Sequence, residues 1–166
     1  MAYPIGYEGS VYVRGFESVM IVNSMMGLIQ EKAPDLILFG CQSNTVPYHA
    51  GGARYYPIAQ HELLLGCQAD AYILLVSVDD DVHYIRRTIS YLEALFDSKV
   101  LALAISPLAE GFRWSTISSS LSLCSSDEMN SVYENLIVEF KLPVFKLSDK
   151  CCYKEITNLC IDYFSS

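Results

Sequence analysis

The sequence predicts an α/β fold: a single domain built on an open, mostly parallel sheet of four to five strands, with helices on both faces. Short apolar runs alternate along the chain with segments of helical spacing, and this alternation is typical of right-handed crossovers between parallel strands. Residues 71 to 78 form a continuous apolar run, which suits a strand covered on both faces. The 166 residues are 52% hydrophobic and only 18% charged, so one domain can bury a large core.

The individual elements follow from apolar spacing and from the residues that begin and end helices. Pro34 ends the first helix, and Pro57 lies in the first turn of the second. Ser125 and Glu128 have the spacing of a capping box. We expect helices over residues 16–32, 57–66, 82–96, from 125 through at least 137, and 149–164, with strands over 36–40, 71–78, 100–105 and 143–145. Residues 106–126 are Ser-rich and are expected to be irregular, with at most a short helical turn.

Charge and cysteine usage exclude several classes of protein. The net charge is −8 without a Lys/Arg cluster, whereas a nucleic-acid partner requires a positive surface. The apolar runs are too short for a membrane span, and the N-terminus lacks the basic and apolar regions of an export signal. The six cysteines form no CxxC pair and, like the three histidines, lack ligand spacing, so we expect no metal site and a reduced, cytoplasmic location.

Ligands of open parallel sheets bind beyond the carboxyl ends of the strands, where helix N-termini also point. This rule selects the loops at 40–57, 77–82 and 106–118. The first loop carries Gln42, Ser43 and Asn44 directly after a strand. These side chains suit recognition of a phosphate, a sugar or a peptide group, or else they stabilise the turn through their own backbone.

Charged side chains extend the candidate ligand-binding set. His49 and Arg54 flank a Gly-Gly pair, and the guanidinium could hold a carboxylate or phosphate unless both residues belong to an ordinary solvated loop. Asp79 and Asp80, with Asp81 beside them, follow the central strand. One of these carboxylates could hold Mg²⁺, or the acids cap the next helix and complement its dipole.

Catalytic residues cannot be assigned, because the chain contains no self-sufficient catalytic motif. There is no GxSxG, no GxGxxG and no Gly-Lys pair, so the GxxxxGK[ST] loop that cradles phosphates is missing. No cofactor is evident, and ATP with magnesium is expected only if a nucleotide loop lies upstream of Met1.

Two segments, PDLILFGCQSN at 34–44 and YYPIAQHELLLGCQADAYILLVS at 55–77, resemble a known family. They are similar to the later part of P-loop domains related to dethiobiotin synthetase, found in poorly characterised prokaryotic proteins and, in related form, in clostridial peptide-maturation systems. The resemblance implies a P-loop or Rossmann-like scaffold. Phe39 stands where the family has an acid that would serve magnesium, and the nucleotide loop itself is missing.

These observations favour a non-catalytic binding or assembly module that holds a protein or peptide partner, in a system that matures peptide natural products. The alternative is the C-terminal part of a longer ATP-dependent ligase or kinase-like enzyme. A third hypothesis is a subunit that forms homo-oligomers through exposed side chains of the first helix.

Overall fold

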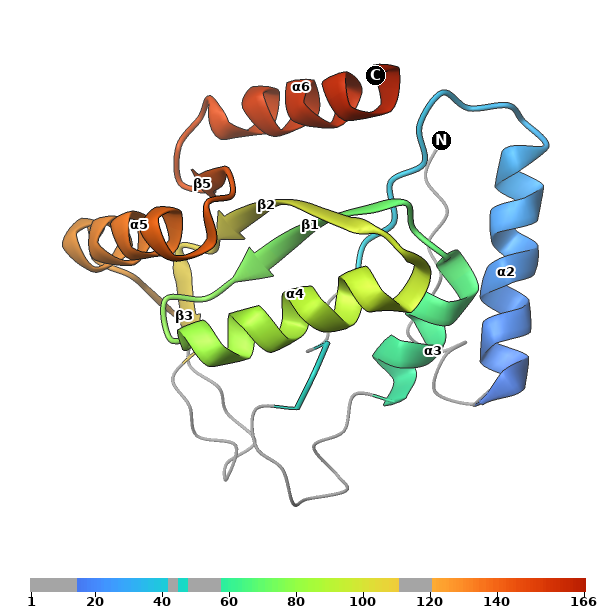
Figure 1. The fold of residues 1–166 in the computed structure, drawn as a ribbon, viewed down its shortest axis with the longest axis horizontal. Helices are drawn as coiled ribbons and strands as arrows, with labels where there is room; N and C mark the ends of the chain where they lie inside the picture. Colours follow the sequence, from blue (N-terminus) through green and yellow to red (C-terminus); the bar gives the residue numbers. More distant parts are fainter. Residues whose placement is uncertain (1–14, 42–44, 48–57, 111–120) are drawn as a thin grey trace. The chain divides into compact units, whose positions relative to one another are not determined.

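The computed structural model describes residues 15–41, 45–47, 58–110 and 121–166 (Figure 1). For residues 109, 110, 121 and 122 it describes the backbone only. The chain divides into two compact units, Met1–Ala69 and Asp70–Ser166. A single domain over residues 1–166 therefore stays a prediction.

Unit 1 is built on two helices, α2 (Phe16–Gln30) and α3 (Ile58–Cys67), which pack against each other. Both agree with the expected helices to within two residues. Val22 of α2 and Leu64 of α3 are buried. Gly66 permits the close approach of the helices, because a Cβ atom there would lie 2.5 Å from the Cβ of Val22.

The expected strand over 36–40 is wrong, since residues 36–41 have no regular secondary structure. The prediction was based on the apolar run Leu36–Phe39, but a strand exists only through hydrogen bonds to a neighbouring strand. Unit 1 offers no such neighbour among the residues that the structure describes. The Leu38 side chain is 83% exposed, which a core strand would not allow.

Unit 2 contains a three-stranded parallel sheet in the order β1 (Ala71–Val76), β2 (Lys99–Ile105) and β5 (Val144–Lys146). The helices of this unit are α4 (Val82–Phe96), α5 (Ser126–Phe140) and α6 (Cys152–Ser165). The α/β class and the open parallel sheet are thus confirmed. The described part of the chain has three parallel strands, however, where four to five were expected.

The core of unit 2 surrounds the central strand β2. Residues 102–105, two on each face of the strand, are at most 1% exposed. Helices α4 and α6 both contact β2, and Figure 1 shows them on opposite sides of the sheet. Helix α4 begins at its N-cap Asp81 and ends at Asp97, which has a left-handed backbone. It buries Tyr84, Ile85, Thr88 and Leu92 on one face.

The stretch 106–126 also differs from its prediction. Two short strands, β3 (Leu108–Glu110) and β4 (Leu121–Leu123), pair antiparallel where irregular chain with a helical turn was expected. Strands of three residues carry too little periodicity to be recognised from sequence. Across the parts of both units that are described, no helix is long and apolar enough to cross a membrane.

Candidate functional site

The carboxyl ends of the three parallel strands meet at one edge of unit 2. The backbone N–H of Ser106, just after β2, donates to the carbonyl of Val76 at the end of β1, over 2.9 Å. The N–H of Leu147, just after β5, donates to the carbonyl of Ile105 over 3.0 Å. These bonds hold the loops that follow β1, β2 and β5 side by side, as expected for a parallel sheet.

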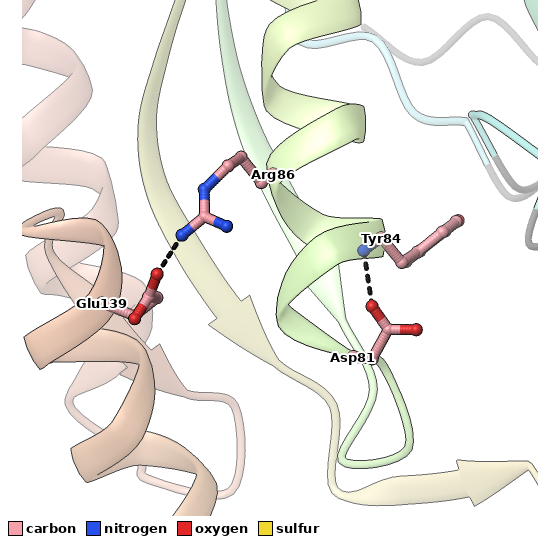
Figure 2. Close-up of polar contacts among 4 residues, drawn as sticks. All are labelled: Asp81, Tyr84, Arg86 and Glu139. Carbon is pink, nitrogen blue, oxygen red and sulfur yellow. Dashed lines mark hydrogen bonds and ion pairs between the residues drawn. The ribbon is translucent and has the colours of Figure 1, made fainter.

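The acidic side chains of the loop after β1 accept hydrogen bonds from nearby backbone N–H groups. The Oδ2 atom of Asp80 accepts a hydrogen bond from the N–H of Ser77 at 2.8 Å. The Oδ1 atom of Asp81 accepts one from the N–H of Tyr84 at 2.7 Å and so caps α4 (Figure 2). Asp79 is exposed. Of the two predicted roles of this acidic run, capping is the one that the geometry supports.

Helix α5 begins at the same edge with a complete capping box, which confirms that prediction. The N–H of Glu128 donates to the Ser125 hydroxyl at 3.3 Å, and the Glu128 carboxylate accepts from the N–H of Ser125 at 2.9 Å. Hydrogen bonds from the Ser125 side chain and backbone lower the pKa of Glu128. The first turn of α5 therefore already holds a carboxylate of the chain itself, with Asp127 beside it.

Cys124 lies between these two loops and was missed as a site residue, because the sequence gives it only the appearance of a small hydrophobe. Its N–H donates to the carbonyl of Pro107 over 2.9 Å. Desolvation, followed by the negative charges of Glu128 and Asp79, raises the pKa of the thiol. A thiol that resists ionisation is a poor nucleophile, so the arrangement does not favour covalent catalysis by Cys124.

Lys146, the last residue of β5, is a second member of this edge that sequence reasoning missed. Its Nζ donates to the Oδ1 of Asn130 at 2.9 Å and lies 4.8 Å from the centre of the Tyr133 ring. The ammonium group is thus positioned by two side chains of α5. The sequence offered one signal for this site residue, namely a lysine directly after the apolar pair of a short strand.

Helices α4 and α5 also contact each other directly. Arg86 of α4 forms an ion pair with Glu139 of α5, as Figure 2 shows, and its guanidinium carbon is 5.7 Å from the centre of the Phe140 ring. Arg86 is half exposed, so we assign the pair to helix packing and not to ligand binding.

The predicted site residues are only partly within the described chain. Gln42, Ser43, Asn44, His49 and Arg54 lie outside the described residues, and Asp79 and Asp80 lie in the loop after β1. The expectation that Gln42, His49, Arg54 and Asp79 gather along one edge of the sheet therefore stays a prediction. Among the residues that the structure describes, no three His, Cys, Asp or Glu side chains are grouped so that they could hold a metal ion.

Comparisons with known proteins do not identify the chain: no family model matches it, and neither curated proteins nor solved structures show a significant match.

Proposed function

We propose that the protein is a non-catalytic binding or assembly module on a P-loop-like or Rossmann-like scaffold, and that it recognises a protein or peptide partner in place of a nucleotide. The single observation that carries this proposal is the occupation of the N-termini of α4 and α5, at the carboxyl edge of unit 2, by the chain's own carboxylates. Asp81 occupies the start of α4, and Glu128 occupies the start of α5.

The electrostatics of this edge argue against phosphate binding. In open α/β folds a phosphate is held by free N–H groups and by the positive end of a helix dipole. Here Tyr84 and Glu128 already donate their N–H groups within the chain. Asp79 and Asp127 add further negative charge beside the same two helix starts. A polyphosphate approaching the start of α4 or α5 would be repelled, and it would have to displace existing hydrogen bonds.

The chemistry of Cys124 and Lys146 is consistent with a binding role. The raised pKa of Cys124 keeps its thiol protonated, and Lys146 is held by Asn130 and Tyr133 as a fixed cation at the end of β5. An ammonium group positioned by an amide oxygen and an aromatic ring suits recognition of a carboxylate or carbonyl group of a peptide. Peptide maturation is the setting that the family resemblance suggests.

Isothermal titration calorimetry with MgATP tests the proposal. The protein is expected to give no saturable heat up to millimolar nucleotide, and saturable binding in the low micromolar range would overturn it in favour of an ATP-dependent ligase or kinase-like enzyme. The Asp81→Asn and Glu128→Gln variants are the matched controls, since each removes one negative charge from a helix start.

Selection of a random peptide library on the immobilised protein tests the positive half of the proposal. We expect convergent peptide sequences whose binding weakens at least tenfold in a Lys146→Met variant. Failure of any sequence to converge, or equal binding by the variant, would contradict recognition of a peptide at this edge.

A further inference from the structure

Helix α2 of unit 1 presents an apolar face that the helix pair itself does not use. The two buried residues of α2, Ser18 and Val22, lie on one side of the helix. Phe16, Met20 and Leu28 lie away from that side and are 77%, 52% and 59% exposed. Positions 16, 20, 24 and 28 are each about one helical turn apart, so Ser24 lies between Met20 and Leu28 on the same side of the helix.

We propose that this face, which we call the α2 stripe (Phe16, Met20, Ser24 and Leu28), pairs with the α2 stripe of a second copy in an antiparallel helix dimer. Exposed apolar patches of this kind are typical of protein–protein contacts. The inference is independent of the proposed function, because it concerns unit 1 alone.

The order of side-chain sizes along the stripe makes it complementary to itself. When two antiparallel copies are centred on residue 22, Met20 of one copy meets Ser24 of the other. Phe16 of each copy then meets Leu28 of its partner. The long Met20 side chain faces the small Ser24, so that the helices can approach without a clash between large residues.

The charges of α2 permit contact between two copies through this face. The chain carries a net charge of −8, so two copies repel each other unless their contact surface is neutral. The stripe meets this condition, since residues 18 to 30 contain no charged side chain.

Glu17 lies on the stripe's side of α2 and distinguishes the two orientations. In a parallel pair the two copies of Glu17 would face each other directly. In the antiparallel pair they are ten residues apart along the axis, about 15 Å at a rise of about 1.5 Å per residue. This separation exceeds the screening length of about 8 Å at physiological salt. Glu31 of one copy lies four residues, about 6 Å along the axis, from Glu17 of the other, and Lys32 beside it offsets part of this repulsion.

Sedimentation equilibrium between about 1 and 500 μM tests the proposal on the full chain. We expect the mass to rise with concentration from 18.6 kDa towards twice that value. A Met20→Glu variant should remain monomeric, because it places a charge at the centre of the contact. Val138→Glu on α5, at a side chain that is 77% exposed, is the matched control and should dimerise like the unaltered protein. A monomer at every concentration, or a dimer that Met20→Glu leaves intact, would overturn the proposal.

Disulfide trapping with a glutathione redox buffer tests the orientation, with the linkage mapped by mass spectrometry. The double variant Met20→Cys/Ser24→Cys should give dimers linked from residue 20 to residue 24. Ser24→Cys alone should give few dimers through residue 24. Efficient linkage between two copies of residue 24 would contradict the antiparallel arrangement.

Discussion

The carboxylate of Glu62 on α3 accepts a hydrogen bond of 2.7 Å from the backbone N–H of Gly15, the N-cap residue of α2. Glu62 is buried, and the contact joins residues 47 positions apart in sequence. It places a negative charge at the positive end of the α2 dipole. This bond, the contact between Gly66 and Val22, and the bond from the Asn23 side chain to the Gly66 carbonyl hold the helix pair of unit 1 together.

Replacing Glu62 should therefore destabilise unit 1. Glu62→Ala leaves the Gly15 N–H without its acceptor and is expected to lower the free energy of unfolding by about 1–3 kcal/mol. Glu62→Gln keeps an oxygen in place and should cost less. Chemical denaturation monitored by circular dichroism measures both. Equal losses in the two variants would show that the hydrogen bond is not the cause.

Replacing glycine by alanine should have opposite effects on stability at Gly66 and at Gly27. Gly66→Ala would force its Cβ against Val22, and we expect a loss of about 1–3 kcal/mol. Gly27→Ala has open space around the new Cβ within α2 and should stabilise by about 0.4–1 kcal/mol. Thermal unfolding of both variants provides the measurement, and a stable Gly66→Ala protein would contradict the packing described for α2 and α3.

The acidic run after β1 gives a test of capping against metal binding. Asp81→Ala should cost about 0.5–2 kcal/mol, because the N-cap bond to Tyr84 is lost. Asp79→Ala, at an exposed side chain, should change stability by less than about 0.5 kcal/mol. Chemical denaturation with and without magnesium distinguishes helix capping from metal binding. A magnesium-dependent stabilisation that disappears in Asp79→Ala would count against the capping interpretation.

The capping box at α5 predicts a pH dependence. The pKa of Glu128 lies below its ordinary 4.5, so the folded state favours the ionised carboxylate. Its contribution is therefore complete above about pH 5 and is lost as the pH falls through the depressed folded-state pKa. The stability difference between the unaltered protein and Glu128→Gln should shrink between pH 6 and pH 3. Glu134→Gln, on the exposed side of the same helix, should show no such change.

Thiol reactivity tests the environment of Cys124. Burial and two neighbouring carboxylates raise its pKa, so alkylation by iodoacetamide at pH 7 should be slow and should accelerate as the pH rises above 9. Cys151 is exposed and serves as the internal reference in the same digest. Faster labelling of Cys124 than of Cys151 at pH 7 would be inconsistent with the described environment.

Much of the fold could be predicted because its signals are local. The capping box of Ser125 and Glu128 and the helix expected over residues 82–96 each depend on signals within one helix, and the structure confirms both. The strand at 36–40 could not be judged locally, because an apolar run becomes a strand only beside a partner. The same reasoning explains β3 and β4, which are too short to show alternation but are stabilised by pairing with each other.

The candidate site was predictable in position but not in composition. The rule that ligands bind beyond strand ends selected the loop after β1, and the structure places this loop, with Asp79 and Asp80, at the carboxyl edge of the sheet. It could not show that Asp80 and Asp81 are already engaged by backbone N–H groups, since those bonds depend on loop geometry. Lys146 reaches the same edge through the order β1-β2-β5, and Cys124 through the pairing of β3 with β4, neither of which sequence periodicity specifies.

The most direct test of the central claim, that the chain's own carboxylates occupy the starts of α4 and α5 at this edge, is an NMR titration of the ¹⁵N-labelled protein with magnesium pyrophosphate. The amide signals of Ser77, Tyr84, Ser106 and Glu128 report on the two helix starts and the strand ends. We predict that they stay unchanged up to millimolar pyrophosphate. Saturable shifts of the Tyr84 and Glu128 signals at micromolar concentration would contradict the account.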